Sequence, residues 1–415
     1  MQRILLTAGL IFFSYAFAKA QDTFNLAFYN ILNYPSAPPA NRADLLGEIL
    51  DEIEPDILMI CELESGSGGQ QILDFSLNRG TGRYEAATYQ SNTSGGGDLQ
   101  QFIYWRKNKF NLVLTDIIQT AVRDINRYRL QLITTESDTD PQFIEVFVAH
   151  LKASTGQANE LLRLAMVEDF TAYLSNLDPN DTVIFAGDLN LYSSSEPAYQ
   201  ILLNSSNDIV LKDPIDAPGD WNSNSAFAYL HTQSTRISNN EFDGFGAGGG
   251  LDSRFDFILL SENTLQEDNP ITYVQDSYKA YGNNENCYNN ALNDTNCTGI
   301  YNQTTREMLY QMSDHLPVVA QLQTNQEFLS NEVIKNETKI SLTQGNIVSN
   351  GTLAIQNNNY EALDYVIFDT SGRIISEATL RQGFSHLDLN TLANGLYYLT
   401  INDATQTTLK FIITS

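Results

Sequence analysis

The chain has 415 residues and 42% of them are hydrophobic, so its length allows two or three domains with sizeable cores. Acidic residues outnumber basic ones by 50 to 23, and the formal net charge is −27. A surface of this sign excludes general affinity for phosphate backbones, so a polyanionic ligand would need a local basic patch or metal ions.

The first twenty residues, MQRILLTAGLIFFSYAFAKA, have the pattern of a secretory signal peptide. Arg3 gives a basic start, residues 4–18 are largely apolar, and Ala18-Lys19-Ala20 is a small-x-small cleavage site. The apolar run is short for a membrane span. We therefore expect residues 1–20 to be removed and the exported, soluble protein to begin at Gln21.

Residues 21–323 alternate between short apolar runs and two stretches of helical periodicity. Apolar side chains recur at helical spacing over residues 42–53 and about 158–177, and Pro55 should end the first helix. Expected strands are FNLAF (24–28), ILMIC (57–61), QFIYW (101–105), RLQLI (129–133), FIEVFVAH (143–150), TVIFAGD, FDFILL and PVVAQL. Strands with helices between them predict an α/β layered domain with mixed sheets.

The C-terminal part of the chain has a different pattern. Residues 324–338 lose periodicity and are expected to form a linker. Residues 339–415 carry short alternating runs, YVIFD, GLYYLTI and TLKFIIT, separated by the turn sequences DTSGR and NGL. They predict a small all-β, sandwich-like domain.

The chain has three cysteines. Cys287 and Cys297 flank an Asn-rich loop and could pair in an oxidising compartment. Cys61 follows an apolar run, so a buried, inert thiol is expected there.

Polar side chains follow, interrupt or immediately precede most of the expected strands of residues 21–323. They are Asn30, Glu62, His150, Asp188, Asn190, Asp256, Asp314 and His315. One such residue is as consistent with a turn as with a site, because Asp and Asn are common where strands end. Several of them indicate a site, because strand ends at one edge of a sheet converge in space.

The chemistry of these side chains indicates hydrolysis of a phosphate ester. Carboxylate and carboxamide oxygens are ligands for Mg²⁺, Mn²⁺ or Ca²⁺ rather than zinc. Histidines beside carboxylates can activate water or protonate a leaving oxygen. The sequence has no Gly-rich phosphate loop followed by Lys-Ser/Thr, which argues against a nucleotide-driven motor or kinase. Metal-assisted attack of water on phosphorus fits this set.

Six motifs in order resemble the endonuclease/exonuclease/phosphatase superfamily: FYNILNY, DILMICELE, VAHLKAS, FAGDLN, RFDFILLS and SDHLPV. The resemblance covers residues 21–323. It implies a four-layered α/β sandwich with two central mixed sheets, and a metal-dependent phosphoric ester hydrolase. It also implies Glu62 as a principal metal ligand with Asn30 and Asp314 near the metal, while Asp188 and Asn190 orient the attacking water and the phosphate.

The resemblance gives the two histidines different partners. Asp256 would pair with His315 and fix its tautomer. His150 would be the second histidine, with Asp98 as a candidate partner. A histidine in AHLKAS resembles deoxyribonucleases and lipid or inositol phosphate hydrolases, whereas abasic-site endonucleases carry Asn there, so a repair role is disfavoured.

Arginines are rare in this acidic domain and could supply local phosphate attraction. Arg127, in NRYRLQL, loosely resembles a phosphate-contacting arginine of the family, and Arg254 and Arg236 could border the substrate. His231 is as consistent with a plain loop histidine as with the substrate rim.

The C-terminal segment resembles the C-terminal sorting domain of type IX secretion cargo from Bacteroidetes. The resemblance rests on YVIFDTSGRII, LDLNTLANGLYYLTI and LKFIITS. It implies the type IX secretion machinery as a partner and a secreted or cell-surface location. An ordinary carbohydrate-binding or adhesion module is the alternative.

Together, the two resemblances imply a secreted, Mg²⁺-dependent (or Mn²⁺- or Ca²⁺-dependent) phosphodiesterase. The first expectation is a nuclease acting on extracellular DNA or RNA, as a monomer without a stable protein partner. The alternative is a phospholipase-type (sphingomyelinase-like) or phosphomonoester hydrolase. Sphingomyelinases of this family have an apolar hairpin for membranes, and no such exposed aromatic hairpin is identified in the sequence, which favours the nuclease. The acidic net charge argues against a nuclease. A binding protein with a dead site is disfavoured, because no member of the set is missing.

Overall fold

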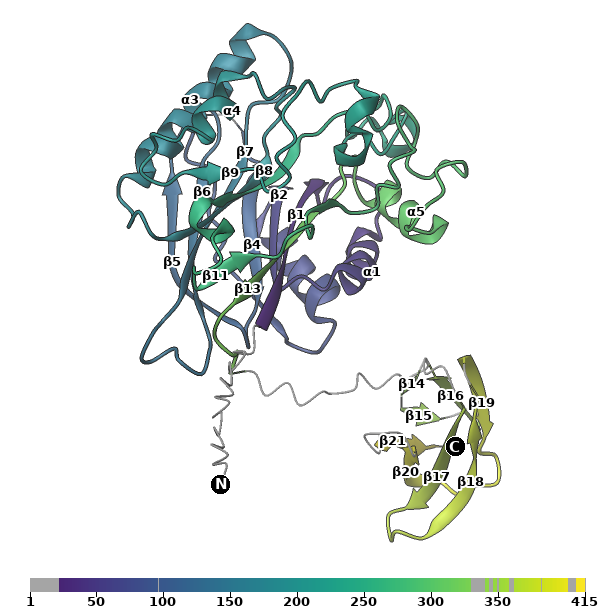
Figure 1. Cartoon of the computed structure of the whole chain (residues 1–415). Coiled ribbons are helices and arrows are strands. Elements are labelled where there is room, and N and C mark those ends of the chain that lie inside the picture. The colour runs from purple at the N-terminus through teal and green to yellow at the C-terminus, as the bar shows by residue number, and fades with distance from the viewer. Residues whose placement is uncertain are drawn as a thin grey trace, which may run out of the picture. The chain divides into compact units, whose positions relative to one another are not determined.

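Two mixed β-sheets form the centre of the first part of the chain (Figure 1). The computed structural model describes residues 22–95, 97–329, 340–342, 346–348, 351–357, 362–381, 383–401 and 408–414. The chain forms two compact units, and the boundary between them in the sequence falls between residues 330 and 331. The expected signal peptide, residues 1–20, lies outside the described residues. Within the described ranges, no helix is long and apolar enough to cross a membrane.

The first sheet has the strand order β11-β13-β1-β2-β4-β3, with β12 also paired to β13. Its strands are β1 (Asp22–Tyr34), β2 (Ile57–Leu63), β3 (Tyr84–Ala86), β4 (Gln100–Arg106), β11 (Ile271–Tyr273), β12 (Lys279–Ala280) and β13 (Val318–Thr324). β1 and β2 are parallel and the other pairs are antiparallel. The parallel pair brings the C-terminal ends of β1 and β2 to one edge.

The second sheet has the order β5-β6-β7-β8-β10-β9. Its strands are β5 (Phe110–Ile118), β6 (Ile125–Leu132), β7 (Phe143–His150), β8 (Thr182–Asp188), β9 (Leu211–Lys212) and β10 (Asp256–Ser261). β7 and β8 are parallel, with His150 opposite Asp188. β10 is antiparallel to β8, so its first residue, Asp256, also lies opposite Asp188.

Figure 1 shows α3 and α4 on the outer side of the second sheet and α1 on the outer side of the first. The helices of the unit are α1 (Arg42–Ile53), α2 (Gly66–Gln71), α3 (Gln157–Leu174), α4 (Pro197–Leu202) and α5 (Gln303–Met312), with short π- or 3₁₀-helical segments at Ile72–Asn78, Ser225–Leu230, Asn240–Phe242 and Glu262–Leu265. α1 ends at Ile53, just before Pro55, because proline cannot continue a helix. α3 confirms the second expected helix but ends earlier, at Leu174.

The alternation of side chains along β8 shows how the layers pack. Ile184 and Ala186 belong to the core shared with the first sheet, whereas Phe185 belongs to the core against α3. The ring of Phe185 lies 4.3 Å from that of Phe170 in α3, measured between centroids. Each such buried aromatic stabilises the fold by about 1.5–3 kcal/mol. The expected four-layered sandwich with two central mixed sheets is confirmed.

The second unit is built from strands alone within the residues described for it. One sheet has the order β14-β16-β19 and the other β15-β21-β20-β17-β18. The strands are β14 (Ile340–Leu342), β15 (Ile347–Val348), β16 (Thr352–Asn357), β17 (Leu363–Asp369), β18 (Ile374–Leu380), β19 (Gly383–Asp388), β20 (Gly395–Ile401) and β21 (Thr408–Ile413). The DTSGR sequence turns between β17 and β18, where Asp369 accepts hydrogen bonds from the amides of Ser371 and Arg373.

The domain boundaries of the sequence analysis stay predictions, with one local correction. Residues 325–328, expected to belong to the linker, pack on the first unit: Phe328 is buried and its ring lies 5.9 Å from that of Phe110. Residues 330–338 of the expected linker lie outside the described residues.

Candidate active site

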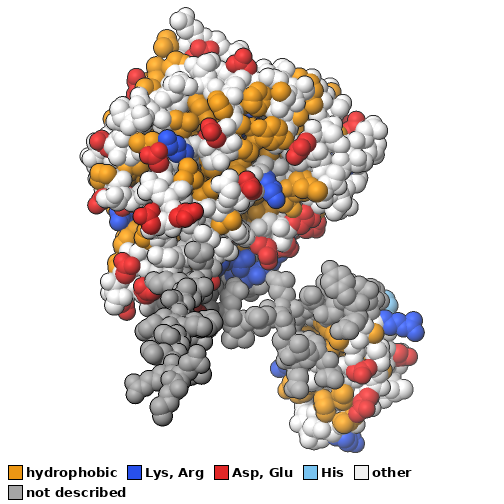
Figure 2. Space-filling model, in the orientation of Figure 1, with side chains coloured by type: hydrophobic (Ala, Val, Ile, Leu, Met, Phe, Trp, Pro, Cys, Tyr) orange, Lys and Arg blue, Asp and Glu red, His pale blue; other side chains and the backbone are white. Residues whose placement is uncertain are grey.

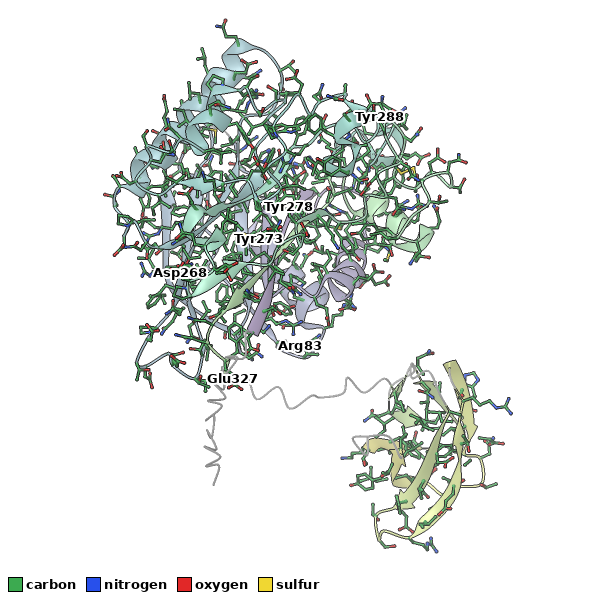
Figure 3. The ribbon with its side chains drawn as sticks, in the orientation of Figure 1. Arg83, Asp268, Tyr273, Tyr278, Tyr288 and Glu327 are labelled. Carbon is green, nitrogen blue, oxygen red and sulfur yellow. A yellow bond between two sulfur atoms is a disulfide. The ribbon has the colours of Figure 1, made fainter. Side chains whose placement is uncertain are left out.

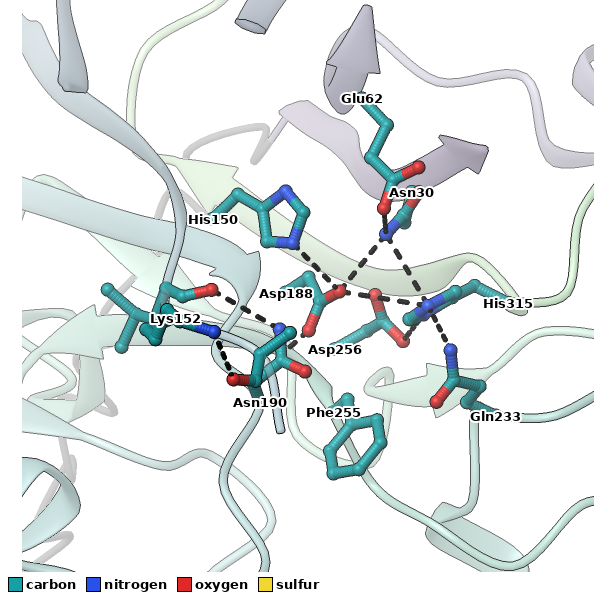
Figure 4. A network of polar contacts seen from close by, with 12 residues as sticks. Asn30, Glu62, His150, Lys152, Asp188, Asn190, Gln233, Phe255, Asp256 and His315 are labelled. Atoms are coloured by element: carbon teal, nitrogen blue, oxygen red, sulfur yellow. Dashed lines mark hydrogen bonds and ion pairs between the residues drawn. The ribbon is translucent and has the colours of Figure 1, made fainter. Parts of the chain in front are cut away.

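Most of the polar strand-end residues of the sequence analysis meet where the two sheets face each other at one edge (Figure 4). The parallel pairs β1–β2 and β7–β8 bring Asn30, Glu62, His150 and Asp188 to this edge. Asp256 joins them because its strand begins where β8 ends. The site therefore draws on both sheets.

The Asn30 carboxamide links the two sheets. Its Nδ2 donates to Glu62 Oε1 at 3.1 Å and to Asp188 Oδ2 at 3.0 Å. The same atom lies 3.4 Å from His315 Nε2. Asn30 is fully buried, so these contacts fix the distance between the two carboxylates.

His315 is held by a short contact to a buried carboxylate. Its Nδ1 lies 2.7 Å from Asp256 Oδ2, which is the pair that the family resemblance implied. Burial lowers the pKa of His315, but attraction to Asp256, Asp188 and Asp314 outweighs it and raises the pKa well above its usual range. His315 is therefore suited to carry a proton at neutral pH.

His150 lies in the opposite electrostatic situation. Its Nε2 is 3.6 Å from Asp188 Oδ2, and its Nδ1 has no hydrogen-bond partner among the described residues. Burial, Arg123, His315 and Lys152 all lower its pKa well below the usual range, so the ring is neutral. Asp98, the candidate partner, is exposed and makes no hydrogen bond or ion pair with His150 in the described part of the chain.

The carboxylates of the site repel one another. Burial raises the pKa of Glu62, and Asp314 raises it further. Burial likewise raises the pKa of Asp188, with added contributions from Asp256 and Glu62. Ligand atoms of Glu62, His150 and Asp188 all lie within 4.8 Å of one another. The carboxylate oxygens of Glu62 and Asp188 are hard donors that repel each other, and both properties fit a divalent cation, which would offset the excess negative charge.

Asp314 and Asn190 stand at the border of this cluster. Asp314 Oδ2 accepts from Gln233 Nε2 at 3.1 Å and from the Ala247 amide at 2.7 Å. Its Oδ1 is buried and has no hydrogen-bond partner among the described residues. Asn190 lies beyond β8, where its amide N–H donates to Asp188 Oδ1 at 3.1 Å and its Nδ2 donates to the Leu151 carbonyl at 3.3 Å.

Two arginines expected at the substrate lie elsewhere. Arg127 is in the middle of β6, where it donates to Glu145 at 2.8 Å and to the Tyr173 hydroxyl at 2.8 Å. Arg254 donates to both oxygens of Asp213, at 2.7 and 2.9 Å, and is 1% exposed. Arg127 is bonded to Glu145 and Tyr173, and Arg254 to both oxygens of Asp213, so the structure brings neither guanidinium to the strand-end cluster, contrary to the expectation that they bind substrate.

Two other residues proposed for the rim are also part of the interior. Arg236 is buried, donates to the carbonyls of Tyr310 and Gln311, and lies over the ring of Phe242. His231 is buried and its Nε2 lies 2.9 Å from the Trp221 carbonyl. The hydrogen bond of Arg254 to Tyr278, a residue labelled in Figure 3, belongs to the same interior.

Sequence reasoning missed Arg123 and Gln233. Arg123 is half-buried and donates to the carbonyls of His150 and Leu151 at 3.2 and 3.1 Å. Since β6 is antiparallel to β7, a residue just before β6 lies at the edge where β7 ends, and this rule could have found Arg123. Gln233 Nε2 lies 2.7 Å from His315 Nε2 and also donates to Asp314. No sequence signal marks it.

The question of whether Cys287 and Cys297 pair is answered by the structure, in which they form a disulfide. Cys61 is buried, as expected, and is not part of a disulfide. Burial raises the pKa of its thiol well above the usual range, which makes it unreactive.

A four-layered α/β sandwich with carboxylates and histidines at the shared edge of its sheets defines a metal-dependent phosphoric ester hydrolase. The chain belongs to the endonuclease/exonuclease/phosphatase family, whose model matches residues 23–380. A model described as a secretion system C-terminal sorting domain matches residues 348–415. The two matches overlap over residues 348–380, which lie in the second structural unit. The sorting domain marks the enzyme for export by the type IX secretion machinery to the cell surface or the extracellular space.

Several solved structures share the fold. An endonuclease/exonuclease/phosphatase family protein from Bacteroides thetaiotaomicron is 16% identical, with a TM-score of 0.45, and the match covers 74% of this chain and 99% of that one. D. rerio TDP2, complexed with single strand DNA product, is 15% identical, with a TM-score of 0.46, and the match covers 72% of this chain and 98% of that one. The human Nocturnin catalytic domain with bound sulfate is 18% identical, with a TM-score of 0.43, and the match covers 73% of this chain and 97% of that one. No curated protein matches the chain.

Proposed function

We propose that this enzyme is a nuclease that hydrolyses extracellular DNA or RNA by in-line attack of water, with Mg²⁺, or Mn²⁺ or Ca²⁺, as cofactor. The observation that carries the proposal is the meeting of three carboxylates, a carboxamide and two histidines at one edge. These residues are Glu62, Asp188, Asp256, Asn30, His150 and His315.

Glu62, Asn30 and Asp314 are the residues that would hold the cation. The Asn30 amide orients Glu62 by donating to its Oε1. Asp314 Oδ1 has no hydrogen-bond partner among the described residues, so this oxygen is free to coordinate a cation. A divalent cation bound there would polarise the phosphoryl group and offset charge on the leaving oxygen.

Asp188 and His315 are suited to the proton transfers. The raised pKa of Asp188 brings it closer to neutral pH, which favours acceptance of a proton from the attacking water. Asn190, next to it, would orient that water and the phosphate. Asp256 keeps the proton of His315 on the ring, so that the imidazolium can donate to an oxygen of the reacting phosphate.

Arg123, Lys152 and His150 would bind the phosphate. Arg123 and Lys152 lie close enough to His150 to lower its pKa, which places two positive charges beside the site of an otherwise acidic protein. Figure 2 shows how sparse basic side chains are on the visible face of the first unit. The neutral ring of His150 can donate one N–H to a phosphate oxygen. These two cationic side chains would attract the phosphate locally, although the net charge of −27 repels it overall.

The distribution of apolar side chains favours a soluble polymer over a lipid substrate. The most exposed large apolar side chains in the described part of the first unit come from separate segments of the sequence: Phe75, Val113, Leu161, Ile237, Ile300 and Leu329. Insertion into a bilayer surface needs a contiguous apolar patch. This contrast supports a nuclease over a sphingomyelinase-like enzyme.

The test is hydrolysis by the purified protein from Gln21 onward. Single- and double-stranded DNA, RNA, sphingomyelin and a phosphomonoester would be incubated with Mg²⁺, Mn²⁺ or Ca²⁺, each against EDTA. We expect cleavage of DNA or RNA that needs the cation. Cleavage of sphingomyelin or the monoester alone would replace the nuclease with the alternative, and inactivity of the folded, metal-loaded protein on every phosphodiester would refute the proposal.

We also propose that residues 1–20 start the export as a signal peptide and that the mature enzyme acts as a monomer. N-terminal sequencing of the secreted protein should then begin at Gln21. Light scattering should give the mass of a single chain, and a dimer mass would contradict this.

A further inference from the structure

A glycine-rich segment lies against Asp314 at the border of the site. Residues 239–250, here called the glycine loop, include the run GFGAGGG. The Ala247 amide donates to Asp314 Oδ2 at 2.7 Å, and Gln233 Nε2 donates to the same oxygen at 3.1 Å. Both donors bind one oxygen, and Oδ1 has no partner among the described residues. The carboxylate is therefore held in one orientation with one oxygen left over.

The glycine loop has its own internal framework. Asn239 Nδ2 donates to the carbonyls of Gly244 and Gly246, at 2.9 and 2.8 Å. The Ser234 hydroxyl donates to the Ala247 carbonyl at 2.9 Å, on the other side of the amide that binds Asp314. These bonds set the position of the Ala247 N–H.

One glycine of the loop is required by the approach to Asp314. Gly246 has φ +80°, and a Cβ there would lie 2.9 Å from Asp314 Cγ. Gly244 has almost the same backbone, φ +83°, but a Cβ there would meet no atom within 4 Å in the described structure. The two glycines share the same backbone requirement and differ only in what a side chain would push against.

We propose that the glycine loop is a positioning device for the metal site, which holds Asp314 in the orientation that leaves its Oδ1 free to bind a cation. The inference rests on the proposed role of Asp314 at the metal. Hydrogen-bonded partners of a ligating carboxylate fix its orientation, and losing them weakens metal binding or activity by about 10–100-fold. Gly246, Asn239 and Gln233 are thus positioning residues that act through Asp314.

The experiment compares Gly246→Ala with Gly244→Ala in the mature chain. Free Mn²⁺ is measured by electron paramagnetic resonance during titration of each protein, and thermal unfolding is recorded in EDTA. Both variants strain the same kind of backbone, so Gly244→Ala gives the loss of melting temperature that the strain alone causes, and the contact with Asp314 should add to this loss in Gly246→Ala. Only Gly246→Ala should weaken Mn²⁺ binding, by about 10–100-fold, because only its methyl group displaces Asp314.

The outcomes separate the positioning role from the proposed function. Wild-type protein that binds Mn²⁺ while the two variants bind it equally well overturns the positioning role alone. Wild-type protein that does not bind Mn²⁺ overturns the proposed metal site itself. If Gly246→Ala does not fold, Asn239→Ala loosens the same loop without adding atoms, and unchanged Mn²⁺ affinity in that variant overturns the inference.

Discussion

Replacing Asp256 with asparagine should separate catalysis from stability. The amide oxygen of Asn can still accept the His315 Nδ1 proton at the position of the present 2.7 Å contact, but the charge is lost. Since Asp256 raises the pKa of His315, the imidazolium becomes harder to keep, and we expect kcat to fall by about two to four orders of magnitude. Asp256 also repels Asp188, so relief of that repulsion should keep the free energy of unfolding within about 1 kcal/mol of wild type.

The matched control is Asp213→Asn, at another buried aspartate with a short ion pair. Asp213 binds both ends of the Arg254 guanidinium, and the side chains are 1% and 2% exposed, so asparagine leaves a buried charge unpaired. We expect a loss of about 3–5 kcal/mol in the free energy of unfolding. Activity per folded molecule should stay close to wild type.

The assay for this pair is urea unfolding combined with kcat at saturating Mg²⁺ under conditions where both variants are folded. An Asp256→Asn enzyme that keeps most of its turnover would refute the role given to His315. A folded Asp213→Asn enzyme with strongly reduced turnover would indicate that Arg254 acts at the substrate site, and it would refute the purely structural role given to Arg254.

Four further predictions follow the same geometry. Glu62→Gln should lower activity and raise the Mg²⁺ concentration needed, because it removes the charge that binds the cation, and an unchanged Mg²⁺ dependence would place the metal elsewhere. His150→Ala should lower kcat by about two to three orders of magnitude in steady-state assays, because it removes a hydrogen-bond donor to the phosphate, with the circular dichroism spectrum retained. In EDTA, Asp188→Asn should be more stable than wild type at pH 8 but not at pH 4. Because the pKa of Asp188 is raised in the folded state, the folded protein binds more protons than the unfolded protein at pH values above the ordinary pKa of aspartate. The free energy of unfolding of the wild type therefore falls as the pH rises through that window. Deleting residues 339–415 should leave hydrolysis by the purified enzyme unchanged but move activity from the culture medium to the periplasm of the native organism, and normal secretion would contradict the sorting role.

The sequence predicted the site residues that lie at strand ends, because that rule needs only local information. Glu62, His150 and Asp188 each end an apolar run, and parallel neighbours bring such ends together. The arginines could not be assigned this way. Arg127 and Arg123 are four residues apart, and only the pairing of β6 with β7 shows that Arg123 lies beside His150 while Arg127 lies opposite Phe147.

Contacts between distant segments were beyond the sequence for the same reason. Gln233 reaches Asp314 across 81 residues of chain, and the Ala247 amide reaches it across 67. Neither segment has a periodic pattern, so nothing local indicates which carboxylate it will meet. The register within each sheet could be inferred from alternation, but the approach of loops to the sheet edge depends on packing of the whole unit.

The Asn30 carboxamide, with one nitrogen shared between Glu62 of the first sheet and Asp188 of the second, makes the enzyme sensitive to the alignment of its two halves. Productive catalytic geometry tolerates displacements of only about 0.5 Å. A small slide of one sheet over the other would therefore silence the enzyme while each sheet keeps its own hydrogen bonds. Loss of turnover should precede loss of secondary structure on gentle denaturation, and substitutions between the sheets, at Ile184 or Ile258, should lower turnover from a distance.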